Sequence, residues 1–207
     1  MALAAVGLPT RGLTGHRRLL VREAGVEYML ARPGDVPTYV ARGAADLGIV
    51  GRDVLLESGA DLLDLVDLGY GVCRFVVAGP AEAAGRVEWI SERAVGVATK
   101  YVGVAERHFA RRALPVEIIR LSGAVELAPQ VGLSDWIVDL VSTGRTLREN
   151  GLAVVEEIAT CSARLVANRV SYARDRERIV ALAERFEAWS RVPDASAPSL
   201  AATGTFP

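Results

Sequence analysis

The stretch DWIVDLVSTGRTL, from Asp135 to Leu147, decides the fold that we expect for this chain. Its first half, DWIVDLV, has the apolar composition of a buried strand, and its end has the composition of a helix start. Between them the chain passes through Ser142, Thr143 and Gly144, which is more polar than a simple connection requires. A strand that leads through a polar turn into a helix is the repeating unit of α/β sheets.

The same unit recurs on both sides of this stretch. Predicted strands are VEYMLA (26–31), ADLGIVG (45–51), GVCRFVVAGP (71–80), AVGVATK (94–100), VEIIRL (116–121) and two extended runs within LAVVEEIATCSARLVANRV (152–170). Predicted helices are GDVPTYVARG (34–43), RDVLLESG (52–59), VAERHFARRAL (104–114), SGAVELAP (122–129) and ARDRERIVALAERFEAWS (173–190). The alternation predicts an α/β fold of parallel or mixed sheets with helices on both faces.

Composition narrows the class of protein. Apolar residues make up 51% and charged residues 24% of the 207 positions, which is typical of a globular chain. The net charge of −1 argues against a nucleic-acid binder, and no apolar run approaches the length of a membrane span. Cys73 and Cys161 have no metal-type spacing, so we expect a reduced, cytoplasmic protein without a secretory leader.

The loop after the strand DWIVDLV is a candidate anion site. Gly144 allows backbone N–H groups to approach a phosphate, and Ser142, Thr143 and Thr146 add hydroxyl donors at a helix start. Asp139 is suited to accept hydrogen bonds from two sugar hydroxyls. Together they indicate a ribose 5-phosphate site, with a polar strand-to-helix connection as the alternative. The loop has neither a P-loop ending nor a GxGxxG pattern, so triphosphate hydrolysis is not indicated.

Two other strand ends carry candidate residues. Lys100 could meet a pyrophosphate and Tyr101 could stack on a base, or they are an exposed lysine beside a half-buried tyrosine. Ser122 could cap a helix that contains Glu126, and by physics alone ordinary capping electrostatics explain that pair better than a functional role does.

A third strand end, GIVGRD, places Arg52 and Asp53 at a helix start, where they either line a cleft or form an exposed pair. His108 is expected to pack beside Phe109. Two histidines and two cysteines do not assemble a Ser-His-Asp set, a Cys-His set or a metal cluster from protein side chains.

Several of these segments, taken in order, resemble one known family. They are GDVPTYV, GAADLGIVGRDVL, DLGYGVCRFVVA, VATKY, LSGAVELAP, DLVSTGRTLRENGL and SARLVANR. The match as a whole extends from about Arg17 to about Arg169. The family is ATP phosphoribosyltransferase, and more narrowly its short-form catalytic subunit, which opens histidine biosynthesis.

The resemblance implies a bilobed, type II periplasmic-binding-protein-like fold. Residues 1–80 and 163–192 would form lobe I, residues 81–162 would form lobe II, and residues 193–207 would be a disordered tail. The enzymes of this family transfer the phosphoribosyl group of phosphoribosyl pyrophosphate to N1 of the adenine of ATP, and they release pyrophosphate. The alternative function is a non-catalytic nucleotide-binding or phosphosugar-binding protein of the same fold.

The resemblance also implies roles for individual residues. Asp139 would hold the ribose hydroxyls, the run Ser142, Thr143, Gly144, Arg145 and Thr146 would hold the 5-phosphate, and Glu126 would face the nucleotide and ribose. Asp139 and Glu126 are therefore the expected catalytic residues. Lys100, Tyr101, Arg52 and Asp53 would face the nucleotide or pyrophosphate. Mg²⁺ would be carried mainly on the substrate.

Partners and the start of the chain complete these expectations. The short form implies a homodimer within a hetero-oligomer that contains a regulatory subunit resembling histidyl-tRNA synthetase. The family begins with a strand and a Pro-Lys-Gly-Arg turn, whereas MALAAVGLP resembles the end of the family's first helix. We therefore expect that Met1 lies within that helix and that the opening strand is not included.

Overall fold

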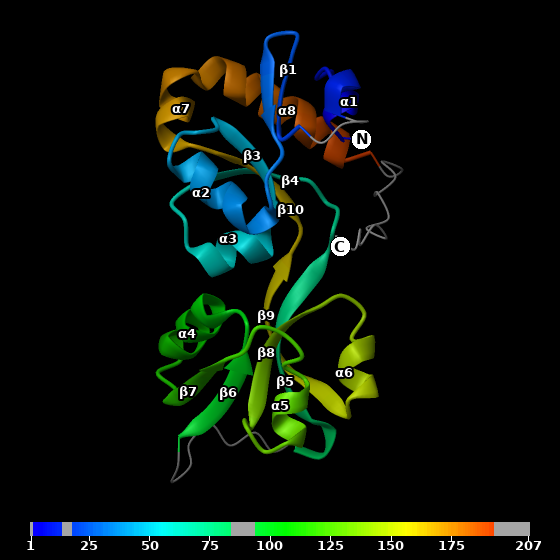
Figure 1. Cartoon of the computed structure of the whole chain (residues 1–207), viewed down its shortest axis with the longest axis vertical. Coiled ribbons are helices and arrows are strands. Elements are labelled where there is room, and N and C mark those ends of the chain that lie inside the picture. The colour runs from blue at the N-terminus through cyan, green and yellow to red at the C-terminus, as the bar shows by residue number, and fades with distance from the viewer. Residues whose placement is uncertain (1, 14–17, 84–93, 193–207) are drawn as a thin grey trace. The chain divides into compact units, whose positions relative to one another are not determined.

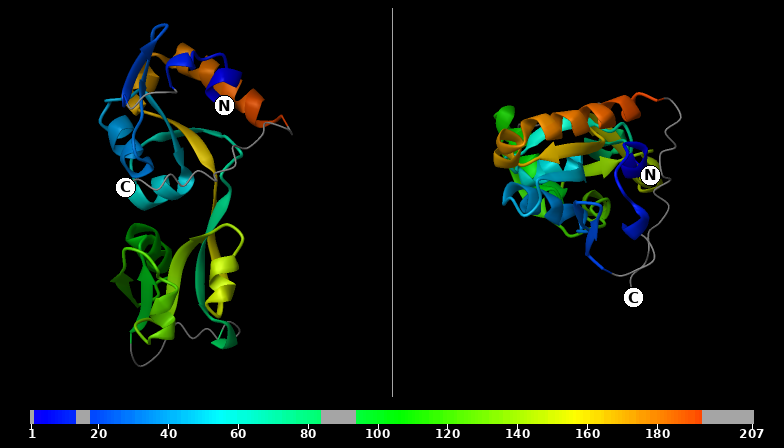
Figure 2. Two further views of the ribbon diagram at one scale, coloured as in Figure 1. Left: turned by 45° about the vertical axis from the view of Figure 1, so that its right-hand side comes forward. Right: turned by 90° about the horizontal axis from the view of Figure 1, so that it is seen from above.

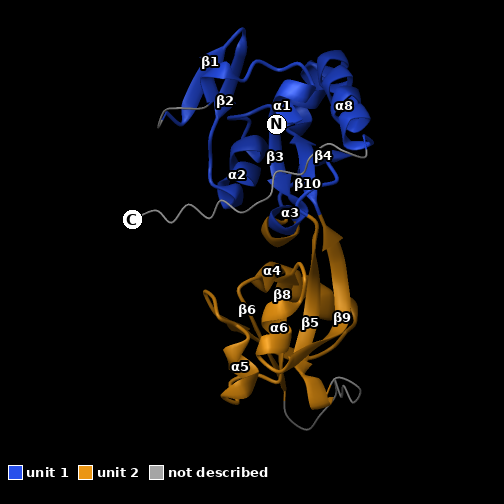
Figure 3. Ribbon diagram, turned by 90° about the vertical axis from the view of Figure 1, so that its right-hand side faces the viewer, with its two compact units in different colours: residues 1–55, 60–71, 162–207 blue, residues 56–59, 72–161 orange. Residues whose placement is uncertain are grey.

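The computed structural model describes residues 2–13, 18–83 and 94–192, and these residues form two compact units (Figures 1 and 3). Unit 1 comprises residues 1–55, 60–71 and 162–207, and unit 2 comprises residues 56–59 and 72–161. The predicted tail, 193–207, lies outside the described residues, as does most of the charged stretch between residues 81 and 93.

Unit 1 is built around a three-stranded sheet with the order β3-β10-β4. The strands are β3 (Leu47–Gly51), β4 (Leu63–Asp67) and β10 (Ala163–Ala167). The central strand β10 is antiparallel to both neighbours, so the strand that returns late in the chain fills the middle of the sheet. A β-hairpin, β1 (Leu20–Glu23) and β2 (Val26–Met29), forms a separate two-stranded sheet.

The helices of unit 1 correspond in part to the segments predicted as helical, and residues 169–174 are helical although no separate helix was predicted there. They are α1 (Ala2–Ala5), α2 (Val36–Ala41), α3 (Arg52–Ser58, whose residues from 56 on belong to unit 2), α7 (Arg169–Arg174) and α8 (Arg176–Ser190), with 3₁₀ turns η1 (Arg11–Leu13) and η2 (Pro33–Asp35). Helix α2 is followed by Gly43 and α3 by Gly59, both with positive φ (75° and 61°), as glycines beyond a helix end usually have.

Helix α8 lies across the sheet of unit 1 (Figure 2) and forms its core with one face. Ile179 and Phe186 are buried, and Phe186 packs in a cluster with Val66 and Leu165 of the sheet. Leu182, Ala183 and Trp189 pack against the same cluster. The helical spacing of these apolar residues predicted this face, and the structure confirms it.

Unit 2 contains a five-stranded sheet with the order β7-β6-β8-β5-β9. Its strands are β5 (Cys73–Pro80), β6 (Val95–Thr99), β7 (Val116–Arg120), β8 (Trp136–Val141) and β9 (Leu152–Cys161). Around it lie the helices α4 (Val102–Arg111), α5 (Leu127–Gln130) and α6 (Arg145–Glu149), with the 3₁₀ turn η3 (Ala81–Ala83). Two apolar clusters, one containing Phe75 and Phe109 and the other Ile137 and Leu147, form the core.

The parallel or mixed sheets that we expected are present as a mixed sheet in unit 2, whereas the three-stranded sheet of unit 1 is antiparallel. In unit 2, β6 is parallel to β7 and to β8, whereas β5 is antiparallel to β8. Among the residues that the structure describes, the predicted strand 26–31 pairs only with β1, as a hairpin. Local sequence patterns indicate that a segment is extended, but the direction of its neighbour depends on long-range pairing.

The predicted boundary between the lobes is also shifted. We expected residues up to Pro80 in the first lobe, but the main segment of unit 2 begins at Val72. The reason is that β5 pairs with both β8 and β9, which places the whole strand in the sheet of unit 2. At the other boundary β9 ends at Cys161, and Ser162 is the first residue of the returning segment of unit 1.

Two predicted helix starts differ in detail. The helix expected over 122–129 begins at Leu127, and its N-cap position is Glu126, so Ser122 does not cap it. Ala124 adopts a positive φ of 49°, which keeps the preceding residues out of the helix. The helix expected from Thr146 begins one residue earlier, at Arg145.

No helix among the described residues is long and apolar enough to span a membrane.

Candidate functional site

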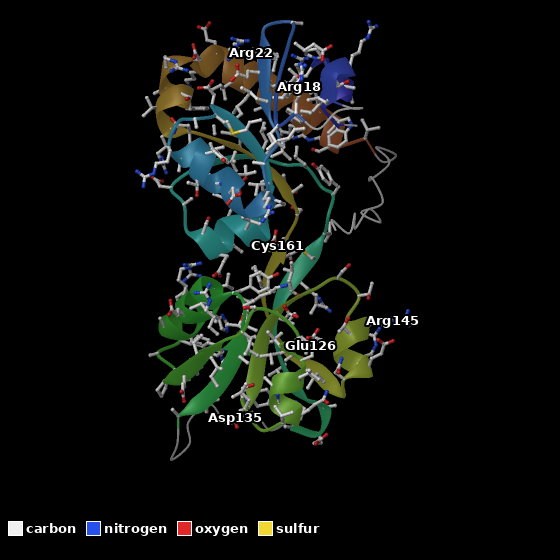
Figure 4. All side chains as sticks on the ribbon, in the orientation of Figure 1. Arg18, Arg22, Glu126, Asp135, Arg145 and Cys161 are labelled. Carbon is white, nitrogen blue, oxygen red and sulfur yellow. The ribbon has the colours of Figure 1, made fainter. Side chains whose placement is uncertain are left out.

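The candidate site lies at one edge of the sheet of unit 2. Strands β7, β6 and β8 are adjacent and parallel, so their carboxyl ends meet at the same edge. The chain leaves these ends through Lys100, through the loop that leads to Glu126, and through the loop that begins at Ser142. In Figure 4 Glu126 marks this side of the sheet, and Asp135, which precedes β8, marks the opposite side. Parallel pairing therefore brings three of the sequence-predicted segments together.

Thr99 connects these segments at the end of β6, the middle one of the three parallel strands. Its side chain is fully buried, and its hydroxyl donates to the carbonyl of Val138 at 2.7 Å. The same hydroxyl accepts a hydrogen bond from the Tyr101 backbone N–H at 2.9 Å. The Thr99 carbonyl accepts from the backbone N–H of Leu121 at 2.9 Å. Thr99 therefore contacts three parts of the chain: the segment after β6, the segment after β7, and β8, the strand that carries Asp139.

Lys100 extends beyond the end of β6 with its ammonium group over the ring of Tyr101. The Lys100 Nζ lies 4.9 Å from the ring centroid, a distance suited to a cation–π contact. Partial burial by itself lowers the pKa of Lys100. The hydrogen bond with Tyr101 and the charges of Asp139 and Glu126 outweigh burial, so the pKa lies above its ordinary value. Lys100 is therefore an exposed lysine whose charge is within electrostatic reach of both carboxylates.

Tyr101 is fixed by an aromatic neighbour on β5. Its ring meets Phe75 edge-on, with 4.8 Å between centroids and an interplanar angle of 79°. Phe75 is fully buried in the core cluster, so one side of the tyrosine ring is anchored to the sheet. Tyr101 is half-buried rather than free in solvent, and it is a rigid element of this edge.

Asp139 is a half-buried carboxylate near the end of β8. Burial raises its pKa, since removal from water disfavours the charged form. A hydrogen bond from the Leu140 backbone and the charge of Lys100 oppose this rise, and the charge of Glu126 adds to it. The charge on Asp139 is thus incompletely compensated within unit 2, which favours an additional cationic or hydrogen-bond-donating partner.

The loop from Ser142 to Thr146 is exposed except at Gly144, which is partly buried. Gly144 occupies the N-cap position of α6 with φ 70° and ψ 13°, in the left-handed region. A Cβ at this position would lie 3.2 Å from Arg148 Nη1 and 3.7 Å from Val141 Cγ1. Glycine is therefore favoured here by its backbone conformation, and an added Cβ would also require the Arg148 side chain to shift slightly.

Two arginines of α6 behave differently. The side chain of Arg145, a predicted phosphate ligand, pairs with Glu149 one turn later at 2.7 Å and is 79% exposed. Arg148 instead donates from Nη1 to the Thr143 carbonyl at 3.1 Å, and it lies beside Gly144. The sequence analysis missed Arg148, although its position one turn into the helix, on the side of the loop, is the available signal.

Arg52 and Asp53 belong to unit 1 and are described within that unit. They begin α3 directly after β3, as predicted. The Arg52 backbone N–H donates to the carbonyl of Ser162 at 2.9 Å, and the charge of Arg52 helps to lower the pKa of Asp67. Asp53 lies against Gly51, where an added Cβ would be 2.1 Å from its Oδ1. Within unit 1, these two residues therefore have structural contacts of their own.

A carboxylate that the sequence analysis missed stands at the start of α4. Glu57 accepts from the backbone N–H groups of Gly103 at 3.1 Å and Val104 at 2.9 Å, through both of its oxygens. The carboxylate compensates the positive end of α4, which directly follows Lys100 and Tyr101. Glu57 thus stabilises the segment that carries the cation of the site.

His108 packs as expected and lies apart from the edge. Its ring contacts Phe109 edge-on at 5.0 Å, and its Nε2 lies 3.5 Å from Glu156 Oε1. Burial lowers its pKa, although Glu156 opposes that effect. Across residues 2–13, 18–83 and 94–192 no three His, Cys, Asp or Glu side chains form a group that could hold a metal ion.

These features define the class of protein. Two α/β units are linked by strands, and polar loops gather at the carboxyl edge of parallel strands, which is the arrangement of type II periplasmic-binding-protein-like folds. A solved structure described as "ATP phosphoribosyl transferase (HisG:HisZ) complex from Thermotoga maritima" is similar to this chain. The TM-score is 0.75 at 37% sequence identity, over 90% of this chain and 89% of the other.

Sequence comparisons identify the family. The family model "HisG: ATP phosphoribosyltransferase" matches residues 32–188. An ATP phosphoribosyltransferase of Moorella thermoacetica is 53% identical over 189 residues, which cover 88% of this chain and 83% of that protein. One from Rubrobacter xylanophilus is 53% identical over 174 residues, which cover 83% and 81% respectively. The chain belongs to the ATP phosphoribosyltransferase family.

Proposed function

We propose that this chain transfers the phosphoribosyl group of phosphoribosyl pyrophosphate to N1 of the adenine of ATP, and that the carboxyl edge of unit 2 binds the phosphoribosyl donor. One observation carries the site assignment. Parallel pairing of β7, β6 and β8 gathers a lysine, two carboxylates and a glycine loop at one edge, in a chain of this family.

The 5-phosphate binds at the loop from Ser142 to Thr146. The positive φ of Gly144 and its lack of a Cβ let the loop backbone approach an anion, and three hydroxyls flank it. Helix α6 has only five residues, so its dipole contributes little beyond the local N–H groups. Arg148, which braces the Thr143 carbonyl, keeps the loop in this shape.

Asp139 binds the ribose hydroxyls and stabilises positive charge on the ribose. The reaction passes through an oxocarbenium-like transition state, in which the anomeric carbon is most cationic. A half-buried carboxylate, whose pKa is raised by burial, gains most from a nearby cation, because water screens it incompletely. This interaction is stronger in the transition state than in the ground state, so it accelerates the reaction.

The bond changes need little acid–base machinery. The lone pair of adenine N1 forms the new bond to the anomeric carbon, and the bond from that carbon to the pyrophosphate oxygen breaks. Pyrophosphate leaves with the electron pair, and we assign to Lys100 the role of balancing that charge, which its raised pKa supports. Glu126 shares electrostatic contact with Lys100 and Asp139 and holds the ribose and nucleotide side. Alignment supplies much of the catalysis, on the order of 7–11 kcal/mol in favourable cases.

Mg²⁺ fits this chemistry as a cation carried mainly by the pyrophosphate of the substrate. Asp139 and Glu126 offer carboxylate oxygens, which Mg²⁺ prefers, and a half-buried Asp139 with incompletely compensated charge is suited to a nearby cation. When bound, the ion would neutralise charge on the leaving pyrophosphate. The residues of the chain keep the roles given above.

The regulatory partner follows from the similar solved complex, whose title names HisG and HisZ. We propose that this chain acts with a regulatory subunit of that kind, in a hetero-oligomer. The partner has a direct consequence for the assay, because the chain must be measured with and without it.

A pyrophosphate-release assay with ATP, phosphoribosyl pyrophosphate and Mg²⁺ tests the proposed function. Release should require both substrates, and the nucleotide product should carry the ribosyl group at N1, as shown by mass and ultraviolet spectra. Omission of either substrate is the control. A folded chain that binds both substrates and releases no pyrophosphate, with its partner present, would contradict the proposal.

A further inference from the structure

Thr99 is the buried polar side chain at the centre of the candidate site, and it has no place in the chemistry described so far. Its exposed fraction is 0%, and both hydrogen bonds of its hydroxyl are short and internal to unit 2. One bond reaches the residue before Asp139, and the other reaches the residue after Lys100. A single hydroxyl therefore spans the two segments that carry the opposed charges.

The hydrogen bonds of the Thr99 hydroxyl lie where the pairing of β6 with β8 ends. The parallel register of β6 with β8 ends at the pair Thr99 and Val138, and the chain then turns into α4. Tyr101, at the N-cap position of α4, has φ −108° and ψ 66°, and no side chain caps the helix from that position. The Thr99 hydroxyl thus ties the turn to β8 at the point where ladder hydrogen bonds no longer do so.

We propose that Thr99 is a positioning residue for phosphoribosyl transfer, whose hydroxyl fixes the placement of Lys100 relative to Asp139. This inference rests on the proposed function, because it assigns Lys100 to the leaving pyrophosphate and Asp139 to the ribose. Thr99 does not contact the reacting atoms in this scheme. It acts through the two residues on either side of the bond that breaks.

The physical reason is alignment. A displacement in which both partners are held by binding depends steeply on their placement, and a shift of about 1 Å can lower the rate about 10²-fold. Without the hydroxyl, the Val138 carbonyl would lose a partner in a buried position and the Tyr101 N–H would lose one in a part-buried position. The turn at Lys100 would then move to satisfy them, and Lys100 would move with it.

Three variants separate positioning from general stability. Thr99→Val keeps the β-branched shape and removes the hydroxyl, and Thr99→Ser keeps the hydroxyl and removes the methyl group. Val97→Ala is the matched control, because Val97 is fully buried two residues earlier on the same strand, between Ile118 and Trp136. It lowers stability by leaving a cavity and touches neither hydroxyl bond.

The expected result is a fall in kcat of about tenfold to 10²-fold for Thr99→Val, measured per folded chain together with the regulatory subunit. KM for ATP should change much less than kcat. Thr99→Ser should recover most of the lost activity, and Val97→Ala should keep kcat despite a lower melting temperature. The pH–rate profile of Thr99→Val should also shift, since Lys100 and Asp139 titrate under each other's influence.

Three other outcomes would contradict the positioning role of Thr99. A Thr99→Val enzyme with unchanged kcat overturns it, and so does a Thr99→Ser enzyme that is as slow as Thr99→Val. An equal loss of kcat in Val97→Ala would reduce Thr99 to a packing residue. Asp139→Asn in the same assay isolates the underlying assumption. If Asp139→Asn is fully active, the site itself is misassigned. If Asp139→Asn is slow while Thr99→Val is normal, only the positioning role fails.

Discussion

Lys100 and Asp139 lie within electrostatic reach of each other at the carboxyl edge of unit 2, and the pKa of each is raised. For Lys100 the neighbouring charges and Tyr101 outweigh burial, whereas for Asp139 burial outweighs the lysine. The two charged groups are therefore stabilised to different degrees. Neighbouring groups stabilise the positive charge of Lys100, whereas the negative charge of Asp139 would be stabilised further by an additional cation or hydrogen-bond donor.

This imbalance makes Asp139→Asn a variant that gains stability and loses activity. The native state holds the proton of Asp139 more tightly than the unfolded chain does, so ionisation costs stability as the pH rises through the raised pKa. The asparagine variant should therefore melt higher than the parent at neutral pH. About 1 kcal/mol corresponds to roughly 2–4 °C at this chain length. Calorimetry across pH checks the sign, because the advantage should shrink in acid, where the aspartate is protonated in both states.

Turnover should move in the opposite direction. Loss of a carboxylate directed at a developing positive charge is expected to lower kcat by about 10²-fold, with a smaller change in the affinity for phosphoribosyl pyrophosphate. Steady-state kinetics of pyrophosphate release and calorimetric titration separate the two quantities. A kcat within about twofold of the parent would contradict the role of Asp139 in the transition state.

Gly144→Val tests the phosphate loop, and Gly151→Val is its matched control. Both glycines have positive φ, 70° and 68°, so both substitutions strain the backbone by about 1–2 kcal/mol or more. A Cβ at position 151 meets nothing within 4 Å, whereas one at position 144 lies 3.2 Å from Arg148. We expect similar losses of stability, but a loss of phosphoribosyl pyrophosphate affinity of about tenfold or more only for Gly144→Val. Equal affinities in the two variants would remove the loop from the binding site.

The two cysteines provide a test of the strand register in unit 2. Cys73 on β5 and Cys161 on β9 are direct partners across the antiparallel pair, and both pack in the same core cluster. Directly opposed residues of antiparallel strands have Cα atoms about 4.5–5.5 Å apart, which lies within the range that a disulfide spans. Treatment with oxidised glutathione should therefore convert both thiols into one disulfide, with release of two reduced glutathione molecules.

Thiol titration after denaturation, with and without prior reduction, measures that conversion. Cys73→Ser is the control, since its remaining Cys161 is buried and should stay a thiol or form only a mixed disulfide. If the parent chain forms only mixed disulfides with glutathione, the register of β5 with β9 differs from the one described.

Asn168 lies in SARLVANR, one of the segments that resemble the family, and its side chain has a structural role. Its side-chain oxygen accepts from the N–H groups of Val170 and Ser171 at 2.9 Å each, and its amide donates to the Val40 carbonyl at 2.8 Å. Asn168→Ala removes the cap and leaves buried groups without partners, at a cost of about 2–3 kcal/mol.

Asn168→Asp distinguishes the two functions of this side chain. The carboxylate keeps the cap but cannot donate to Val40, and it repels that carbonyl oxygen. Protonation restores a donor, so the destabilisation relative to the parent should decrease as the pH falls. Chemical denaturation at several pH values measures this trend. A pH-independent difference would mean that the contact with Val40 contributes nothing measurable.

The amino-acid sequence by itself determined most of what is local in this protein. Apolar periodicity identified the buried face of α8, and glycines after helices identified the ends of α2 and α3. The order of motifs identified the family, and the polar loop after DWIVDLV identified the candidate anion site. Each of these signals is carried by residues that lie close together in the chain, where backbone conformation and side-chain spacing act directly.

The tertiary structure decided which segments lie beside one another. Only strand pairing makes β5 and β10 antiparallel members of different sheets, brings Cys73 opposite Cys161, and lets the Thr99 hydroxyl bridge β8 and the turn before α4. The same packing gave Arg148, rather than Arg145, the contact with the loop backbone. These relationships join residues far apart in sequence, or depend on which of two nearby side chains of a short helix contacts the loop backbone. Their energies depend on burial and partner geometry, which no local pattern specifies.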